Sequence, residues 1–413
     1  ALIVAPTSLM HNWFKEAEKF TPELKVLLLQ GPDRHQNFEQ IPHYDIVLTT
    51  YPLLARDEEQ LKQYEYHQLI LDEAQNIKNP RAKAAQVVRQ LKARHRLCLT
   101  GTPMENHLGE LWALFYFLMP GFLYSQEIFN KKYRHPIEKR GDQQLRQKLV
   151  NRIKPFILRR LKTDVAKELP EKTTIEVNID MNDQQSKLYE AVRATMQENI
   201  QKIVAEKGFK RSQIQILDAL LKLRQVCCHP SLLKLDSVKT GQAHSAKLEQ
   251  LMDMVVPMVE EGRKILIFSQ FTSMLELIEQ QLHHAEIGYV KLTGKTKKRD
   301  EVITAFQSGQ VPVFLISLKA GGVGLNLTAA DTVIHYDPWW NPAAEDQASD
   351  RAWRIGQDKP VFVYKLITNK SIEEKILALQ QNKAELAQSI LSTDHEGEAK
   401  LTENDVMNLF EKF

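Results

Sequence analysis

The chain has 413 residues, which is too many for one hydrophobic core, and 43% of them are hydrophobic and 26% charged, as in globular proteins. No apolar run is long enough to span a membrane, and three cysteines cannot form a disulfide framework. These features exclude a membrane-spanning or disulfide-built protein. They predict an intracellular protein of two or more domains without a membrane partner.

The formal net charge is only +3, but the charge is unevenly distributed. Residues 131–172 contain 14 Lys and Arg against 5 Asp and Glu. A local excess of this size predicts a surface for a polyanion, with a solvated helical face as the alternative.

The first part of the chain alternates short apolar runs with polar or amphipathic stretches. This rhythm predicts a parallel sheet with crossover helices. The chain starts at Ala1 within such a run and not with Met, so we expect a piece that begins inside a domain. The runs that predict buried strands are Leu2–Ala5, Asp45–Thr49, Gln68–Leu71 and Arg96–Thr100.

The middle of the chain has apolar positions at helical spacing and few strand signals. After a linker or hinge at Glu168-Leu-Pro-Glu171, helices are predicted at Asn182–Lys207 and Gln213–Val226. Asn182 is suited to cap the first of them. Cys227-Cys228-His229 has no second pair of ligands at finger-like spacing, so a buried helix end is favoured over a metal site.

Strand signals return in the last part of the chain and predict a second parallel sheet. A long helix is then predicted at Ile372–Leu391, and a short acidic helix near Glu403–Phe410. The apolar runs of this sheet are Ile265–Ser269, Tyr289–Leu292, Val313–Ser317, Thr332–Tyr336 and Phe362–Leu366.

The pair Asp72-Glu73 is the strongest local indication of chemistry, because it follows the apolar run Leu69–Leu71. A strand there would place both carboxylates at the carboxyl edge of a parallel sheet, where ligands bind in open α/β folds. Adjacent carboxylates at that edge serve phosphate chemistry, in which one holds Mg²⁺ and the other orients the attacking water. An ordinary surface pair is the alternative, and the apolar strand before it makes that alternative weaker.

The triplet Gly294-Lys-Thr296 looks like the end of an ATPase phosphate loop, but its context is different. That loop needs four residues between its first Gly and the Gly-Lys pair, whereas five separate Gly288 from Gly294. The basic residues that follow predict a polar turn and not the start of a helix. No other stretch of the 413 residues supplies the loop.

Three further stretches carry weaker signals. Thr100-Gly-Thr-Pro103 follows a predicted strand, where its hydroxyl groups could link neighbouring loops. Gly321-Gly-Val-Gly324 follows another strand and allows close approach of a phosphate or a sugar. Arg351 and Arg354 are three residues apart, which predicts one helix face and suits a triphosphate, with an ordinary surface helix as the alternative.

These stretches belong to a longer ordered series of blocks, from Ile3-Val-Ala-Pro-Thr-Ser-Leu-Met-His-Asn-Trp13 to Trp353-Arg-Ile-Gly-Gln357. The series resembles the Swi/Snf-type family of double-stranded-DNA translocases in helicase superfamily two, over nearly the whole chain. The blocks between are Asp72-Glu-Ala-Gln75, Leu99-Thr-Gly-Thr-Pro-Met-Glu-Asn106, Phe156-Ile-Leu-Arg-Arg-Leu-Lys162, Leu223-Arg-Gln-Val-Cys227 with His229-Pro230, Ile267-Phe-Ser-Gln-Phe271 and Asp337-Pro-Trp-Trp-Asn-Pro342.

The resemblance implies an α/β fold of two RecA-like parallel-sheet lobes with helical insertions, the first lobe being N-terminally incomplete. The implied domains are lobe one at 1–170, with a basic helical insertion near 112–155, a linker and helical insertion at 171–245, lobe two at 246–390 and a tail helix at 391–413.

The resemblance also implies ATP-driven movement along double-stranded DNA, with ATP and Mg²⁺ in the cleft between the lobes and a nucleoprotein complex as a target for remodelling. Asp72 would bind Mg²⁺, Glu73 would orient the water, and Gln347 would lie on one helix with two arginine fingers, Arg351 and Arg354. The residues implied for the nucleotide are Asp72, Glu73, Gln75, Gly322, Gly324, Arg351 and Arg354. Those implied for nucleic acid are Pro6, Thr7, Ser8, Thr50, Tyr51, Ser269, Gln270, Thr293, Gly294 and Lys319.

Two departures from the family pattern matter. The family's phosphate loop lies upstream of the first block, so we expect this chain alone to hydrolyse little or no ATP and its first lobe to lack a strand. The family most often has His at the position of Trp353. The larger aromatic ring of Trp at this position can change the packing beside the two arginines. Two alternatives stay open: a catalytically silent module that binds DNA or a protein, and a strand-separating helicase on DNA or RNA. We expect the cytoplasm or nucleoid as location in a bacterium, and the nucleus in a eukaryote.

Overall fold

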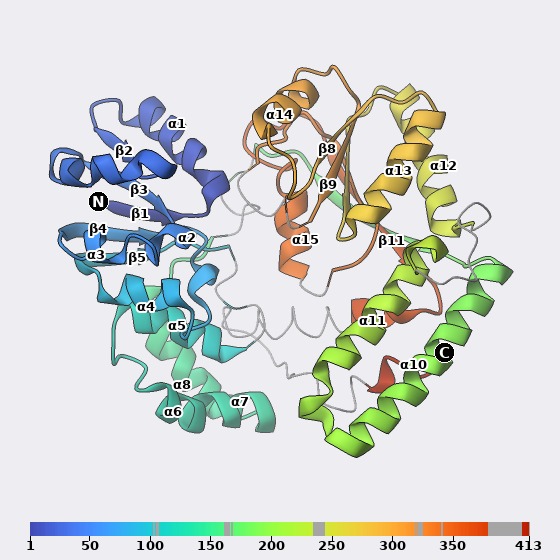
Figure 1. The fold of residues 1–413 in the computed structure, drawn as a ribbon, viewed down its shortest axis with the longest axis horizontal. Helices are drawn as coiled ribbons and strands as arrows, with labels where there is room; N and C mark the ends of the chain where they lie inside the picture. Colours follow the sequence, from blue (N-terminus) through green and yellow to red (C-terminus); the bar gives the residue numbers. More distant parts are fainter. Residues whose placement is uncertain are drawn as a thin grey trace. The chain divides into compact units, whose positions relative to one another are not determined.

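The computed structural model describes residues 1–101, 104, 107–160, 166, 168–233, 244–318, 320, 325–339, 342–378 and 407–412. The chain forms two compact units, and the boundary between them lies between Leu158 and Arg159 (Figure 1). Each unit is built around one parallel sheet. None of the helices in the described ranges is long and apolar enough to cross a membrane.

The first unit contains a parallel five-stranded sheet in the order β2-β3-β1-β4-β5. All four predicted strands are confirmed, with boundaries shifted by up to four residues. The short β2 was not predicted, because three residues give too little pattern. The strands are β1 (Leu2–Ala5), β2 (Val26–Leu28), β3 (Ile46–Thr50), β4 (Glu65–Leu71) and β5 (Lys92–Cys98).

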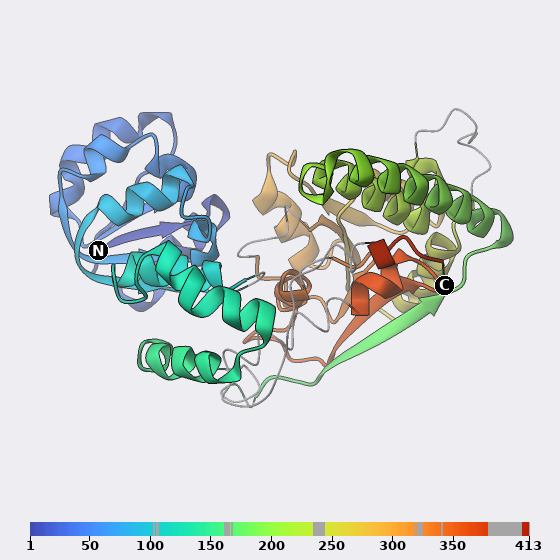
Figure 2. The same cartoon turned by 90° about the horizontal axis from the view of Figure 1, so that it is seen from below.

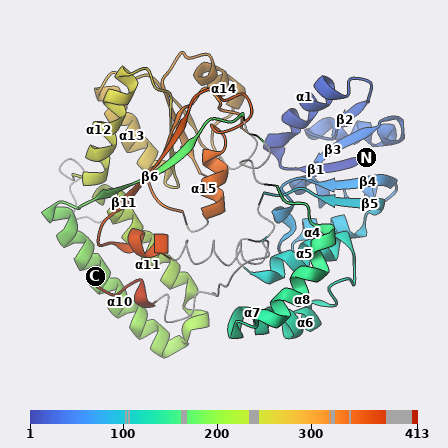
Figure 3. The ribbon, with the colours of Figure 1, turned by 180° about the vertical axis from the view of Figure 1, so that it is seen from behind.

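Helices connect and extend this sheet. In the first part they are α1 (Met10–Phe20), α2 (Tyr51–Leu54), α3 (Glu58–Leu61) and α4 (Lys83–Gln90). The later helices gather around a hydrophobic cluster of their own that includes Trp112, Phe129 and Leu149 (Figure 3). These helices, in the range where a basic helical insertion was predicted, are α5 (Leu108–Leu118), α6 (Gln126–Phe129), α7 (His135–Arg140) and α8 (Gln143–Ile153).

The second unit contains a parallel six-stranded sheet in the order β6-β11-β10-β7-β9-β8. All five strands predicted for this part are confirmed. The sixth, β6, lies where a linker was predicted, and among the described residues it is an edge strand that pairs with β11 (Figure 2). The strands are β6 (Lys172–Ile179), β7 (Ile265–Ser269), β8 (Tyr289–Leu292), β9 (Val313–Ser317), β10 (Thr332–His335) and β11 (Val361–Thr368).

Helices α12 to α15 accompany this sheet, and a pair of longer helices precedes them. The Asn182 side chain accepts a hydrogen bond from the Gln185 amide at 2.8 Å, which confirms the predicted cap of the first long helix. The helices are α10 (Asp183–Lys207), α11 (Gln213–Cys228), α12 (Ala246–Glu260), α13 (Thr272–His284), α14 (Arg299–Gln307) and α15 (Pro342–Ser349).

Cys227 and Cys228 form the buried end of α11, as predicted. Burial raises the pKa of both thiols. The predicted long C-terminal helix is present from Ile372 to Ala378, and Leu409 and Phe410 pack against α10 and α11. The rest of both C-terminal helices predicted from the sequence, residues 379–406, lies outside the described residues.

Candidate active site

Asp72 and Glu73 follow directly after β4, at the carboxyl edge of the first sheet, where the sequence predicted them. The amide of Asp72 donates to the Val4 carbonyl at 2.9 Å, which fixes this loop to the end of β1. The same loop is also fixed to the end of β5, since the Ala74 amide donates to the Leu99 carbonyl at 3.0 Å. The two carboxylates therefore start from a backbone that both neighbouring strands hold in place.

Hydrogen bonds also orient the Asp72 side chain. Trp13 Nε1 donates to Asp72 Oδ2 at 2.8 Å, and the Glu73 amide donates to Oδ1 at 2.8 Å. The Tyr51 hydroxyl donates to the Asp72 backbone carbonyl at 2.7 Å, and burial raises the pKa of that hydroxyl. A carboxylate has about four lone-pair positions, so Asp72 keeps acceptor capacity for a ligand.

Glu73 has left-handed backbone geometry, with φ at 49°. This conformation costs a residue other than Gly of order 1–3 kcal/mol, and such residues are enriched at functional sites. Gln75 Nε2 donates to Glu73 Oε2 at 2.6 Å, and the Thr100 hydroxyl donates to Gln75 Oε1 at 2.7 Å. Thr100 thus links the two loops by a hydrogen bond, as the sequence predicted, and the chain of bonds ends on the Glu73 carboxylate.

The donor set fits Mg²⁺. The described residues contain no group of three or more His, Cys, Asp or Glu that could hold a metal ion by itself. Mg²⁺ is usually held by one or two carboxylates together with phosphate oxygens and water. Asp72 fits as that carboxylate, with nucleotide phosphates as the other ligands.

The stretch at Gly294-Lys-Thr296 is a polar turn, as predicted. The Thr293 amide donates to Thr296 Oγ1 at 3.0 Å, and the Lys295 amide donates to Thr293 Oγ1 at 3.3 Å. The next helix, α14, begins only at Arg299. A phosphate loop leads directly into a helix from its Thr, so this turn does not have that geometry.

The prediction that Gln347, Arg351 and Arg354 share one helix is wrong. Helix α15 ends at Ser349, and the arginines lie in the turns after it. The reason is local: the Ala352 amide bonds back three residues to Ser349, and Gly356 follows at φ +99°, so the chain tightens and leaves the helical path. Arg351 is 3% exposed, whereas Arg354 is exposed.

The residues implied for nucleic acid differ in exposure. Thr7 and Gly294 are exposed, and Pro6, Gln270 and Thr293 are partly buried. Thr50, Tyr51 and Ser269 are buried. Lys319, Gly322 and Gly324 lie outside the described residues, as does the side chain of Ser8.

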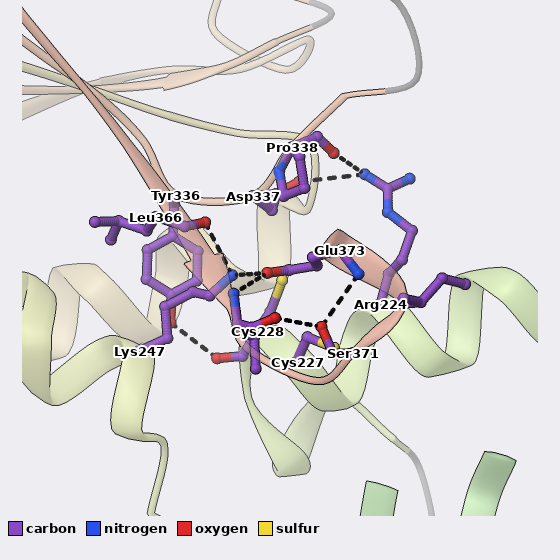
Figure 4. A network of polar contacts seen from close by, with 12 residues as sticks. Arg224, Cys227, Cys228, Lys247, Tyr336, Asp337, Pro338, Leu366, Ser371 and Glu373 are labelled. Carbon is purple, nitrogen blue, oxygen red and sulfur yellow. Dashed lines mark hydrogen bonds and ion pairs between the residues drawn. The ribbon is translucent and has the colours of Figure 1, made fainter. Parts of the chain in front are cut away.

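Asp337 is a residue whose role the sequence did not indicate. It is 1% exposed and accepts hydrogen bonds from the Ser269 hydroxyl at 2.6 Å and from the Gln270 amide at 3.3 Å. Burial raises the pKa of Asp337, against the effect of Arg224, whose guanidinium lies 3.8 Å from Oδ2 (Figure 4). Arg224 also donates to the Pro338 carbonyl. One buried group therefore ties α11 to the loops after β7 and β10.

A second buried pair lies beside this one. The Lys247 ammonium and the Glu373 carboxylate form an ion pair, and each is at most 1% exposed (Figure 4). The Tyr336 hydroxyl donates to the Cys228 carbonyl at 2.8 Å, next to this pair. Trp13, Arg224 and Asp337 all lie in the sequence blocks that resemble the family. The sequence does not show which distant residues they contact, so their hydrogen bonds and ion pairs could not be predicted.

Comparison with known proteins decides the family. The profile of the SNF2-related domain matches residues 1–232, which is more than half of the chain, and the profile of the helicase conserved C-terminal domain matches residues 246–356. The chain belongs to the SNF2-related family. This confirms the resemblance stated from the sequence and the expectation of two parallel-sheet lobes.

Relatives of this SNF2-related chain include bacterial and eukaryotic proteins. A Bacillus subtilis protein named as an ATP-dependent helicase/translocase is 40% identical over 95% of the chain and 43% of its own length. An ISWI chromatin-remodeling complex ATPase of Saccharomyces cerevisiae is 34% identical over 94% of the chain and 36% of its own length. The chain thus spans about two fifths of the length of these relatives. A solved SWI2/SNF2 ATPase core of Sulfolobus solfataricus in complex with dsDNA is 38% identical, with a TM-score of 0.46 over 95% of this chain and 82% of that one.

Proposed function

We propose that the chain is the motor part of an ATP-dependent translocase that acts on double-stranded DNA inside the cell. The observation that carries the proposal is the pair Asp72-Glu73 at a sheet edge, with Glu73 oriented through Gln75 and Thr100. The SNF2-related family and relatives named as a helicase/translocase and as a chromatin-remodeling ATPase support it. By analogy with these names, a nucleoprotein complex is the proposed target.

Each candidate residue has a role in this proposal. Asp72 holds Mg²⁺, which neutralises charge on the phosphates when it is bound. Glu73 orients the attacking water and accepts its proton. Arg351 and Arg354 stabilise the charge that develops on the transferred phosphoryl group, as guanidinium groups do in other nucleotide hydrolases. The proposed nucleotide contacts also include Gln75, Gly322, Gly324 and Gln347.

The proposed DNA contacts are mainly to phosphates, which makes binding sensitive to salt and largely independent of sequence. Exposed Thr7 and Gly294 suit direct contact. Ser269 is fully buried and donates to Asp337, so we propose that it acts by positioning the loop that carries Gln270. Thr50 is also buried and is proposed to act in the same indirect way. Pro6, Ser8, Tyr51, Thr293 and Lys319 complete the proposed set.

The test is ATP hydrolysis with and without duplex DNA, for the wild type and Glu73→Gln. It uses the full-length protein, by which we mean this chain together with the upstream residues that are expected to supply the phosphate loop. We expect duplex DNA to raise the rate and Glu73→Gln to lower kcat by roughly 10²- to 10⁴-fold while duplex binding is kept. Glu18→Gln, at an exposed position on α1, is the matched control and should behave as wild type. A Glu73→Gln protein with wild-type turnover would refute the assignment.

Two additional assays separate the alternatives. Salt-dependent duplex binding without turnover in the full-length wild type indicates a silent binding module, and efficient strand displacement indicates a helicase. Because the 413 residues contain no phosphate loop, we expect turnover from the full-length protein and little or none from this chain alone.

A further inference from the structure

Trp353 lies between Arg351 and Arg354 and joins their turn to a distant segment of the chain. Its indole is 8% exposed, and Nε1 donates to the Pro170 carbonyl at 2.7 Å. A buried indole N–H needs such a partner, since leaving it unpaired costs about 1–3 kcal/mol. The bond therefore fixes both the ring of Trp353 and the path of the chain at Pro170.

The segment around Pro170 is held to the rest of the second unit on both sides of that bond. Leu169 packs against the hydrophobic cluster that contains Trp353. The Val361 amide donates to the Glu171 carbonyl at 2.9 Å, where β11 begins. Lys172 Nζ lies 4.7 Å from the centre of the Trp353 ring and donates to Asp350 Oδ1 at 3.1 Å. The residues Leu169–Lys172 thus form a strip on the turn that carries the arginines, which we name the docked strip.

The other side of the arginine turn is fixed to the body of the second unit. The Leu327 amide donates to the Arg351 carbonyl at 3.0 Å. Gln357 Nε2 donates to the carbonyls of Ala330 at 2.7 Å and Ala352 at 2.9 Å. The turn therefore lies between the body of the second unit on one side and the docked strip on the other, with the Trp353 indole and Asp350 as its contacts with the strip.

We infer that Trp353 is a positioning residue that couples the placement of Arg351 and Arg354 to the docked strip. The strip lies near the start of the second unit and ends on Lys172, the first residue of β6. A displacement of the strip pulls on the Pro170 carbonyl, and the indole transmits that displacement to the backbone between the two arginines. This inference rests on the proposed function of the arginines in ATP hydrolysis.

Two substitutions separate the hydrogen bond from the packing of the ring. Trp353→Phe keeps an aromatic ring and removes the N–H donor. Trp353→His gives a smaller ring that retains an N–H donor. A residue that only fills the core would tolerate Phe better than His, whereas a residue that holds the Pro170 carbonyl would tolerate His better than Phe. Lys172→Met is a control that removes the ion pair with Asp350 and the contact of the ammonium with the Trp353 ring, and leaves the indole bond.

The experiment measures duplex-stimulated ATP hydrolysis and hydrogen exchange in the full-length protein and in these three variants. We expect Trp353→Phe to lower kcat about 10-fold at unchanged KM for ATP, because misplaced arginines weaken the transition state more than the bound substrate. Hydrogen exchange should become faster in the peptide that contains the docked strip and at the Val361 amide. Trp353→His should recover kcat to within about threefold of wild type, and Lys172→Met should keep kcat near the wild-type value.

The inference is overturned if Trp353→Phe keeps wild-type kcat, or if Trp353→His is impaired as strongly as Trp353→Phe. It is also overturned if exchange in the docked strip does not respond to Trp353→Phe. Exchange reports on the strip without any turnover, so a wild-type protein that lacks ATPase activity refutes the proposed function and is distinguished from a failure of the docking itself. Thermal unfolding of each variant identifies a general loss of structure.

Discussion

Thr100 supports the Glu73 carboxylate without touching it. Its hydroxyl donates to Gln75 Oε1, and the Gln75 amide donates to Glu73. Glu73 is held at φ 49°, a conformation that costs energy and persists only where neighbouring bonds determine it. The side chain is therefore fixed by its backbone at one end and by a two-step chain of bonds at the other.

Thr100→Val tests this chain, because it replaces the hydroxyl with a methyl group of similar size and leaves Gln75 Oε1 without its donor. We expect kcat for ATP hydrolysis to fall about 10-fold with little change in KM, since the Glu73 carboxylate loses its fixed orientation and not its charge. The measurement is steady-state ATPase of the full-length protein with saturating duplex DNA.

Thr100→Ser is the matched control, because it keeps the hydroxyl and loses only the methyl group. It should retain kcat within about twofold of wild type. Equal activity of the Val and Ser variants would show that the bond to Gln75 does not contribute to turnover.

Among the secondary-structure elements, buried strands could be predicted well. β7, β8 and β9 have the predicted boundaries at both ends, and β7 and β9 are buried at every position, so the apolar run coincides with the strand. β6 was assigned to a linker although Ile175, Val177 and Ile179 alternate with Glu176 and Asn178, as in a strand with one buried face. Polar residues separate its apolar ones, so it lacks the continuous apolar run by which the buried strands were recognised.

The candidate active site also contains features that the sequence predicted and one that it did not. The position of Asp72 and Glu73 at the sheet edge was predicted correctly because it follows from one strand and one rule about sheet edges. The end of α15 was missed because the chain tightens where helical spacing gives no sign of it, with the Ala352 amide bonding back to Ser349. Helix periodicity at Arg351 and Arg354 contains no information about such contacts.

β10 contains a buried titratable group whose effect on stability can be measured. His335 is 1% exposed, its Nε2 lies 2.8 Å from Ser349 Oγ, and its ring stacks on Phe268 at 5.5 Å between centroids. Burial lowers the pKa of His335 to about 4; the charge of Glu345 raises this pKa by a smaller amount, and the charge of Lys365 lowers it further. The imidazole is therefore neutral in the folded protein at neutral pH.

The sign of the pH dependence follows from this shift. An unfolded His binds a proton near pH 6.5, whereas folded His335 does so only near pH 4. Between these values the unfolded chain binds more protons, so the contribution of His335 to stability is complete above pH 6.5 and is lost as the pH falls toward 4. We expect the free energy of unfolding to fall by about 1.4 kcal/mol per pH unit from this residue alone.

His335→Gln tests the prediction, because Gln keeps hydrogen-bonding groups and does not titrate. Its free energy of unfolding in urea should depend less steeply on pH between about 6 and 5 than that of wild type, by roughly 1 kcal/mol per unit. His284→Gln, at an exposed position on α13, should keep the wild-type slope. Parallel curves for wild type and His335→Gln would contradict the burial of a neutral imidazole.

At the scale of the whole molecule, the distribution of charge matters more than its sum. The net charge is +3, yet residues 131–172 hold 14 Lys and Arg against 5 Asp and Glu. Lys131, Lys132, Lys139, Arg140 and Lys148 are all exposed. Their side chains lie on the helical part of the first unit, which has its own core and can present them without disturbing the sheet.

The double substitution Lys131→Gln with Lys139→Gln tests whether this surface binds DNA phosphates. The affinity for duplex should fall by a similar factor for unrelated sequences, and the slope of log K against log salt should become less negative by about 1–2, because up to two phosphate contacts are lost. Lys187→Gln with Lys202→Gln on α10 removes the same charge from exposed positions and should leave the slope unchanged. If both double variants weaken binding equally, net charge and not this surface determines the affinity. If neither does, the basic helices are a solvated face, and the DNA contacts lie elsewhere on the motor.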